Sequence, residues 1–263
     1  MDIDLNGRSA LVTGSTGGIG YAIARALGRL GATVAVNGRT GERVNAAIER
    51  LRGEVPGAGF IAGIGDVGTE EGAAELVAAL PKVDILINNA GIFEPKPFFE
   101  IPDPEWRRFF EVNVMSGIRL ARAYGPGMVE RGWGRIVFIA SESGINIPVE
   151  MVHYGVTKTA QLAVSRGLAE TVGGSGVTVN SVLPGPTLTE GVADFLETMG
   201  GAGGDLEEKG RAFIAENRPT SLLGRLAQPE EVANMVAYLC TPAASATTGA
   251  ALRVDGGVLR NIG

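Results

Sequence analysis

Short apolar runs alternate with helical patterns along almost the whole chain, and this alternation is the strongest constraint on its fold. The predicted strands are 9–13, 33–37, 59–63, 84–88, 135–139, 177–183 and 251–255. Several are continuously apolar, which is typical of strands buried on both faces of a parallel sheet. Helical patterns fill the intervals, at 18–30, 41–52, 69–80, 104–131, 152–172 and 229–240. We therefore expect an α/β fold: a doubly wound, Rossmann-type parallel sheet of about seven strands with helices on both faces.

The length of the chain and the alternation of predicted strands and helices favour one domain with an insertion. At 263 residues and 45% hydrophobic content, the chain can fill the core of one large α/β domain, which we expect to span 1–263. Residues 188–226 break the alternation with two amphipathic stretches around a glycine-rich tract at 200–204. Connections this long are unusual unless they act as lids or binding loops. We expect a helical substrate lid here, and a solvated insertion is the alternative.

Charge and cysteine content narrow the possible partners and the compartment. A net charge of −6 and a pI near 5.0 argue against a surface that binds nucleic acid or anionic membranes. Cys240 is the only cysteine, which fits a reducing compartment. The N-terminus lacks a signal-peptide pattern, no apolar run approaches about 20 residues, and no Cys/His cluster has metal-ligand spacing. We expect a cytoplasmic protein without a metal site, a nucleic-acid partner or a membrane span.

The first predicted strand leads directly into a glycine-rich turn, TGSTGGIG, that opens a helix. Such a turn lets the backbone approach a pyrophosphate, while the helix N-terminus offers free N–H groups and a partial positive charge. The turn therefore predicts a dinucleotide site. Its candidate cofactor-binding residues are Gly14, Ser15, Thr16, Gly18, Ile19 and Gly20.

A phenol, an ammonium and a hydroxyl recur later at spacings that suit proton transfer on a carbonyl or an alcohol. Tyr154 and Lys158 are four residues apart in the predicted helix 152–172, so they share a face. An ammonium beside a phenol favours the phenolate and is expected to lower the tyrosine pKa. Ser141 closely follows a predicted strand, and open α/β sheets bind ligands at the carboxyl ends of their strands. The alternative is an ordinary surface pair of Tyr154 and Lys158.

Together these motifs resemble those of the classical short-chain dehydrogenase/reductase family, with further likeness to its 3-oxoacyl-acyl-carrier-protein reductases. The glycine spacing is G-x-x-x-G-x-G, as in that family. The other matching motifs follow in the family's order: Asp66 after the third strand, NNAG at 88–91, Asn113, Ser141, Tyr154 with Lys158, and PGPT at 184–187. The resemblance covers essentially the whole chain.

The resemblance implies four catalytic residues. Tyr154 would be the general acid in reduction and the base in oxidation, while Ser141 would hold the substrate oxygen. Lys158 would lower the tyrosine pKa and bind the nicotinamide ribose. Asn113 would support a water in a proton relay to Lys158.

The resemblance also implies where a dinucleotide would lie. Asp66 and Val67 would contact adenine. The adenine-ribose side would be bordered by Asn88, Ala90 and Gly91, and the nicotinamide pocket would be shaped by Pro184, Gly185 and Thr187.

The end of the second strand separates the two nicotinamide dinucleotides. A carboxylate there binds the ribose 2′-OH of NAD, whereas a nearby arginine accepts the 2′-phosphate of NADP. Here Gly38 takes the usual acidic position, Arg39 follows, and Thr40 adds a hydroxyl. We expect NADP(H) to be preferred and NAD(H) to remain possible, unless Arg39 is only a solvated turn residue.

These observations predict an NADP(H)-dependent oxidoreductase that interconverts a carbonyl and a secondary alcohol of a small molecule. A 3-oxoacyl-acyl-carrier-protein reductase is one alternative, although an acidic enzyme would repel an acidic carrier. A dinucleotide-sensing regulator without catalysis is a more distant one. The mostly apolar residues around the catalytic set suggest a medium-sized substrate of apolar character. The family resemblance further implies a homotetramer or a homodimer.

Overall fold

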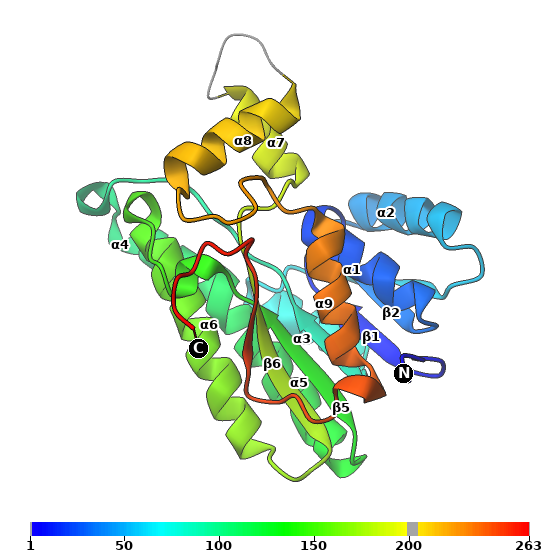
Figure 1. Ribbon diagram of the computed structural model, residues 1–263. Coiled ribbons are helices and arrows are strands. Elements are labelled where there is room, and N and C mark those ends of the chain that lie inside the picture. The colour runs from blue at the N-terminus through cyan, green and yellow to red at the C-terminus, as the bar shows by residue number, and fades with distance from the viewer. Residues whose placement is uncertain (1, 199–204, 263) are drawn as a thin grey trace.

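The computed structural model describes residues 2–198 and 205–262, and its centre is a parallel sheet of seven strands (Figure 1). The strand order is β3-β2-β1-β4-β5-β6-β7, and every neighbouring pair is parallel. The strands are β1 (Ser9–Val12), β2 (Thr33–Gly38), β3 (Phe60–Ile64), β4 (Ile85–Asn88), β5 (Gly134–Ile139), β6 (Val177–Pro184) and β7 (Ala251–Val254). The doubly wound Rossmann-type sheet predicted from the sequence is confirmed.

Strand register explains why the strands are apolar on both sides. Leu11 pairs with Ala35 and Leu86, and Leu86 pairs with Ile136, so these residues form one row across the sheet. That row faces one core, whereas the next row, which begins at Val12, faces the other. Both rows are buried because helices cover both faces of the sheet.

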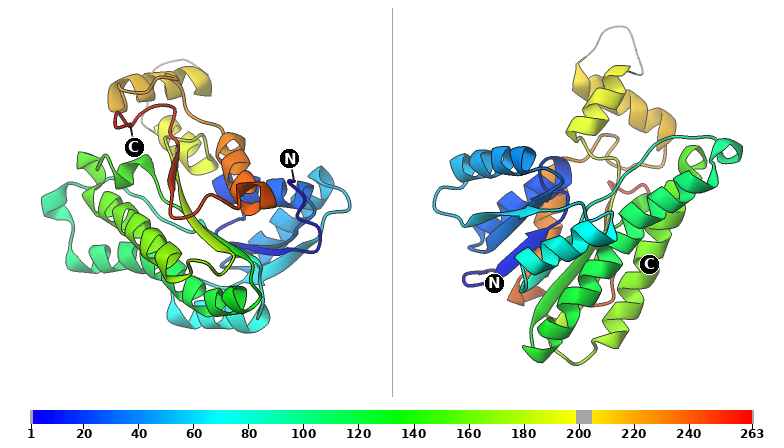
Figure 2. Two further views of the ribbon diagram at one scale, coloured as in Figure 1. Left: turned by 60° about the horizontal axis from the view of Figure 1, so that its bottom comes forward. Right: turned by 180° about the vertical axis from the view of Figure 1, so that it is seen from behind.

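Helices divide between the two faces of the sheet (Figure 2). One face carries α1 (Gly18–Arg29), α2 (Gly41–Glu54) and α9 (Pro229–Cys240). The other carries α3 (Glu70–Ala79), α4 (Asp103–Phe110), α5 (Ser116–Glu130) and α6 (Val152–Thr171). Short 3₁₀ turns complete the regular structure: η1 (Phe98–Glu100), η3 (Glu142–Gly144), η4 (Val149–Met151) and η5 (Pro242–Ala244).

The predicted helix 104–131 is interrupted by a π-helical segment, η2 (Glu111–Met115), between α4 and α5. At its centre the backbone carbonyl of Asn113 accepts a hydrogen bond of 2.7 Å from Gln161 Nε2 of α6. A π-turn widens the helix and releases carbonyls from the regular ladder, as occurs frequently at functional sites. The periodicity of the sequence could not reveal it, because the stabilising contact comes from another helix.

Two helices from the predicted insertion stand above the carboxyl edge of the sheet, α7 (Glu190–Thr198) and α8 (Leu206–Asn217) (Figure 1). They share a small core of Leu196, Ile214 and Leu226 that is separate from the cores of the sheet. The glycine-rich tract 200–204 lies outside the described residues.

Residues 2–198 and 205–262 contain neither a membrane-spanning helix nor a cluster of metal-ligating side chains. Within these ranges no helix has the length and apolarity needed to cross a membrane. The same part of the chain has no cluster of three or more His, Cys, Asp or Glu side chains suited to a metal ion.

Candidate active site

The glycine turn between β1 and α1 has the shape of an anion cradle. Gly14 and Gly18 have φ values of +60° and +55°, which favour glycine. A Cβ at Gly20 would lie 2.5 Å from both Gly14 O and Asn89 Nδ2, so only glycine lets the turn close here. No side chain caps the N-terminus of α1, and its first N–H groups stay available to an anion. These features fit the pyrophosphate of a dinucleotide.

Buried polar side chains hold this turn in place. The Ser15 hydroxyl donates to Val12 O (2.7 Å) and accepts from Asn37 N (2.9 Å), so it braces the turn from inside. Asn37 Oδ1 in turn accepts from Gly14 N (3.0 Å). Of the predicted loop residues, Ser15 therefore directs its side chain at the protein, and its backbone N–H donates to Asn37 O (2.9 Å). Asn37 was missed because it reads as an ordinary strand residue.

The NNAG segment after β4 closes the other side of the turn. Asn89 Nδ2 donates to Thr13 O (2.8 Å) and Gly14 O (3.1 Å), and Thr13 Oγ1 accepts from the backbone N–H groups of Asn89 and Ala90 (both 2.9 Å). Asn88, by contrast, is buried against Gly117 of α5, where a Cβ would lie 3.2 Å from its side chain. Asn89 is the residue whose side chain reaches the loop, and the sequence prediction had omitted it.

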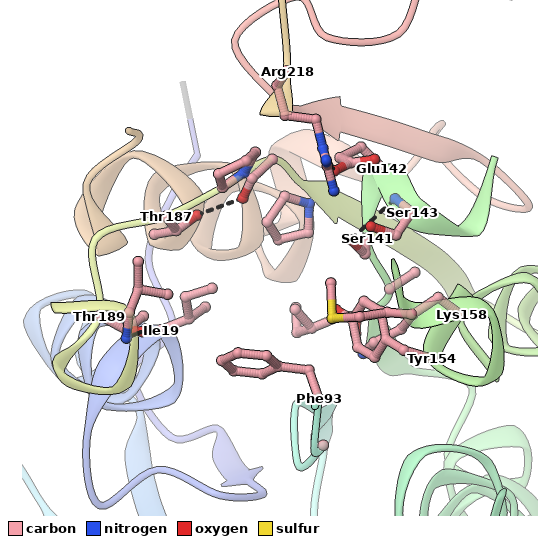
Figure 3. A pocket seen from close by; sticks show the side chains of 18 of the residues that line it. Ile19, Phe93, Ser141, Glu142, Ser143, Tyr154, Lys158, Thr187, Thr189 and Arg218 are labelled. Atoms are coloured by element: carbon pink, nitrogen blue, oxygen red, sulfur yellow. Dashed lines mark hydrogen bonds and ion pairs between the residues drawn. The ribbon is translucent and has the colours of Figure 1, made fainter. Parts of the chain in front are cut away.

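A cavity of about 440 Å³ at the carboxyl edge of the sheet brings three of the four predicted catalytic residues together (Figure 3). Ser141 stands beyond the end of β5, and Tyr154 and Lys158 lie one turn apart on α6. All three line the cavity, as do Gly91 and Ile19. The arrangement places a hydroxyl and a phenol beside one space in which a carbonyl can lie.

Burial dominates the pKa values of Tyr154 and Lys158. Burial raises the pKa of Tyr154 to about 12, an effect that hydrogen bonding by Ser141 partly offsets. Burial also lowers the pKa of Lys158 to about 7, and its Nζ donates to the Ile139 carbonyl (2.9 Å) and lies 5.5 Å from the centre of the Tyr154 ring. The Tyr154 pKa therefore lies above its ordinary value in the protein alone, whereas the sequence had predicted a lowered value. Removal from water penalises the charged form of each group.

Asn113 clamps the strand-end loop to α6. Its Oδ1 accepts from Ile92 N (2.8 Å), and its Nδ2 donates to Ile92 O and Thr157 Oγ1 (both 3.0 Å). A Cβ at Gly91 would lie 3.4 Å from Asn113 Oδ1 and 3.5 Å from Lys158 Nζ, so both groups approach the same backbone. The backbone carbonyl of Asn113 accepts from Gln161 Nε2 (2.7 Å).

The PGPT segment forms the wall on the side of β6. The three residues that were predicted to shape a nicotinamide pocket all line the cavity: Pro184, Gly185 and Thr187. A Cβ at Gly185 would lie 2.7 Å from the Asp255 carbonyl, so the backbone can pass here only as glycine. The Thr187 hydroxyl donates to Gly185 O (2.9 Å) and fixes the turn.

At the end of β2 any side chain in place of Gly38 would crowd Thr16. A Cβ at Gly38 would lie 2.6 Å from Thr16 Cγ2, so an acidic residue would have to displace Thr16. Arg39 and Thr40 are exposed, and the Thr40 side chain caps α2 by accepting from Arg43 N. Arg43 lines a second hollow with Gly14, Thr16 and Gly18, a contribution that the sequence prediction missed.

The adenine-side residues differ in exposure. Asp66 is exposed, and its carboxylate accepts from Gly68 N (3.0 Å). Val67 is buried in the core between the sheet and α3, so its backbone rather than its side chain faces outward.

A buried ion pair beside Ser141 is the feature that the sequence prediction did not foresee. Arg218 Nε donates to Glu142 Oε1 (2.8 Å), and both residues line the cavity together with Glu150 (Figure 3). Burial raises the pKa of Glu142, and the charge and hydrogen bond of Arg218 counteract this. The signal in the sequence was a carboxylate directly after Ser141, in a stretch interpreted as mostly apolar.

Comparisons with known proteins agree with this geometry. A family model described as enoyl-(acyl carrier protein) reductase matches residues 14–259. The chain is 52% identical to the uncharacterized oxidoreductase YvaG of Bacillus subtilis (strain 168), over the full length of both. It is 35% identical to the 3-oxoacyl-[acyl-carrier-protein] reductase FabG of Aquifex aeolicus (strain VF5), over 98% of this chain and all of that protein.

A solved structure shows the same fold. The L-sorbose reductase of Gluconobacter frateurii, crystallised with NADPH and L-sorbose, superposes with a TM-score of 0.93 at 33% identity, with complete coverage of both chains. Fold and site define an oxidoreductase of the dinucleotide-binding α/β class. The chain belongs to the short-chain dehydrogenase/reductase family.

The low pKa of Lys158 predicts how stability changes with pH. Below about pH 7 the folded protein buries an ammonium, whereas between pH 7 and 10.5 the folded lysine is neutral and the unfolded one stays protonated. The unfolded state then binds more protons, so the free energy of unfolding rises with pH in this window. Lys158→Met removes this rise, and its stability relative to wild type should fall by about 2 kcal/mol from pH 6 to pH 9.

Urea unfolding without dinucleotide at both pH values measures this change. Lys82→Met, at an exposed lysine, is the control. Its free energy of unfolding should differ from that of wild type by the same amount at both pH values. A pH-independent effect of Lys158→Met would contradict the burial of a titrating ammonium.

Proposed function

We propose that the protein is an NADP(H)-dependent oxidoreductase that interconverts a carbonyl and a secondary alcohol of a small molecule. One observation carries this proposal: Ser141, Tyr154 and Lys158 line a single cavity that also includes Ile19 of the glycine turn. Reaction site and dinucleotide cradle are therefore continuous. A bound nicotinamide dinucleotide would supply or accept the hydride.

The protein's own residues supply the proton and hold the reacting oxygen. The neutral phenol of Tyr154 donates its proton to the carbonyl oxygen during reduction, and its high pKa keeps it protonated at neutral pH. Ser141 holds the same oxygen through its hydroxyl. Lys158 and Asn113 would link this proton to solvent through a relay, and Lys158 would bind the ribose.

Arginines at the end of β2 support the preference for NADP(H). Arg39 follows Gly38, which carries no carboxylate, and Arg43 lines the hollow at the glycine turn. A guanidinium pairs well with a phosphate, and the absence of a carboxylate removes a repulsive charge. The NADPH complex of the similar L-sorbose reductase supports the same choice. NAD(H) use remains compatible with the fold.

The segment 188–226 would act as a lid on this single catalytic domain. Val192 of α7 and Phe213 of α8 line the cavity, together with Asn217 and Arg218 at the end of α8. Closure of such a lid would exclude water from the reacting groups.

Reduction of a 3-oxoacyl group on an acyl carrier protein is the second candidate. The identity with FabG of Aquifex aeolicus favours it. The net charge of −6 and the absence of a basic residue in 174–176 disfavour docking of an acidic carrier. A free small-molecule substrate is therefore the stronger proposal, and the complete catalytic set argues against a regulator without activity.

A cytoplasmic homotetramer or homodimer completes the proposal. Phe110 at the end of α4, Val129 of α5 and Val156 of α6 are about 40% exposed, at 42%, 39% and 42%. Exposed apolar side chains along these helices fit a surface between copies of the chain.

Tyr154→Phe tests the proton-transfer role. The variant should lose about 10²- to 10⁴-fold in kcat for carbonyl reduction, because no other group replaces the phenol proton. NADPH binding, measured by fluorescence, should stay close to wild type. Tyr124→Phe is the matched control, since Tyr124 is buried in the core and its hydroxyl has no hydrogen-bond partner within the described residues. Retained kcat in Tyr154→Phe would refute the mechanism.

Arg39→Ala tests the cofactor preference. With the variant, kcat/KM for NADPH should drop by about 10- to 100-fold while the value for NADH changes little, because the lost contact concerns only the 2′-phosphate. Arg52→Ala on α2, which removes a guanidinium paired with Glu49 (2.8 Å), should change neither value. A wild-type preference for NADH, or equal losses with both dinucleotides, would overturn the assignment.

A further inference from the structure

The first residue of α7 lies against the glycine turn between β1 and α1. A Cβ at Gly17 would lie 3.0 Å from Glu190 Oε2, and a Cβ at Gly18 would lie 3.3 Å from Thr189 Cγ2. Glu190 also lines the hollow beside this turn, together with Arg43. The segment proposed as a lid therefore places a carboxylate at a turn whose backbone is shaped to receive the phosphates of a dinucleotide.

Arg50 of α2 connects this carboxylate to the turn. Its Nη2 donates to Thr16 O (2.9 Å), and its Nη1 lies 4.0 Å from Glu190 Oε1. The guanidinium carbon also lies 4.7 Å from the centre of the Tyr21 ring on α1. These contacts fix the Arg50 side chain beside the turn and leave its Nη1 on the side of Glu190.

The ion pair of Glu190 and Arg50 is easily exchanged for another partner. The two side chains are 73% and 52% exposed, and their separation of 4.0 Å is longer than a hydrogen bond. Exposed pairs of this kind are weak because water and salt screen them. A guanidinium can instead give a phosphate two short, parallel hydrogen bonds. A dinucleotide phosphate at the turn can therefore replace the carboxylate on Arg50.

Charge in the hollow supports the same exchange. Among the described residues that line it, Glu190 is the only acidic residue and Arg43 the only basic one. While Glu190 stays beside Gly17, its carboxylate repels an incoming phosphate and weakens the attraction of Arg43 and Arg50 for it. Moving this carboxylate away leaves the two arginines as the charged groups at the turn.

We infer that Arg50 is a phosphate-binding residue of the dinucleotide site and that Glu190 is its counter-ion in the free protein, an inference that rests on the proposed dinucleotide-dependent chemistry. Binding of the dinucleotide separates Glu190 from Arg50, and Arg50 then pairs with a phosphate. Glu190 thus lowers the affinity for the dinucleotide, whereas Arg50 raises it. Because Glu190 begins α7, this exchange also releases the contact between α7 and α2.

Glu190→Gln tests the exchange, because it removes the charge and keeps the shape of the side chain. The dissociation constants of NADPH and NADH are measured by fluorescence titration at low and at high NaCl concentration. At about 0.05 M NaCl the variant should bind NADPH about 3- to 10-fold more tightly than wild type. At about 0.5 M the gain should fall below about 2-fold, because salt screens the lost charge. A change in shape or packing would not depend on salt in this way.

Asp194→Asn is the matched control for Glu190→Gln. Asp194 is also exposed on α7 but lies one helical turn beyond Glu190 and does not line the hollow. Its substitution should change neither dissociation constant by more than about 2-fold.

Arg50→Met tests the phosphate-binding role directly. It should weaken NADPH binding by about 10-fold, as the loss of hydrogen bonds to a charged group allows. Arg52→Met, on the same helix but paired with Glu49, should leave the affinity unchanged.

The two dinucleotides identify the phosphate that Arg50 binds. An equal gain with NADPH and NADH in Glu190→Gln would assign the contact to the pyrophosphate, which both carry. A gain confined to NADPH would assign it to the 2′-phosphate.

Four results would overturn the inference. The first is unchanged or weaker binding of both dinucleotides by Glu190→Gln. The second is an equal gain in Asp194→Asn, and the third is a gain that persists at high salt. The fourth is unchanged NADPH binding by Arg50→Met. A wild-type protein that binds neither dinucleotide would instead refute the proposed function, and this inference with it.

Discussion

Parallel strand direction is the constraint on which the rest of the structure depends. Because all seven strands run the same way, the segments that follow β1, β4, β5 and β6 emerge at one edge of the sheet. These segments are the glycine turn, the NNAG segment, Ser141 and the PGPT turn. They are far apart in the sequence but lie side by side in the fold. Helices on both faces bury the central strands β4, β5 and β6 along their whole length, so a ligand reaches them at the carboxyl edge of the sheet.

Rigidity at that edge comes from polar groups that face the protein rather than the ligand. The side chains of Thr13, Asn37 and Asn89 form hydrogen bonds with the backbone of the glycine turn and of neighbouring segments. Asn113 does the same for Ile92. A turn fixed in this way loses little conformational freedom on binding, which is the advantage of a preorganised site.

Local patterns in the sequence predicted what local geometry determines. The spacing of Tyr154 and Lys158 placed them on one helix face, and the alternation of strands and helices predicted the sheet. The contacts that escaped prediction join distant positions: Gln161 with Asn113, 48 residues apart, and Arg218 with Glu142, 76 residues apart. The direction of the Tyr154 pKa shift also differs from the one predicted, because burial depends on the whole fold and not on the spacing of Tyr154 and Lys158.

Two of the buried charged side chains lie at the wall of the cavity. Lys158 and Glu142 are both withdrawn from water, and each borders the cavity rather than the cores of the sheet. A purely structural ion pair would gain little over apolar side chains of similar volume. Arg218, moreover, belongs to the segment that carries α7 and α8, whereas Glu142 belongs to the turn after β5. Their ion pair therefore joins these two parts of the chain at the wall of the cavity.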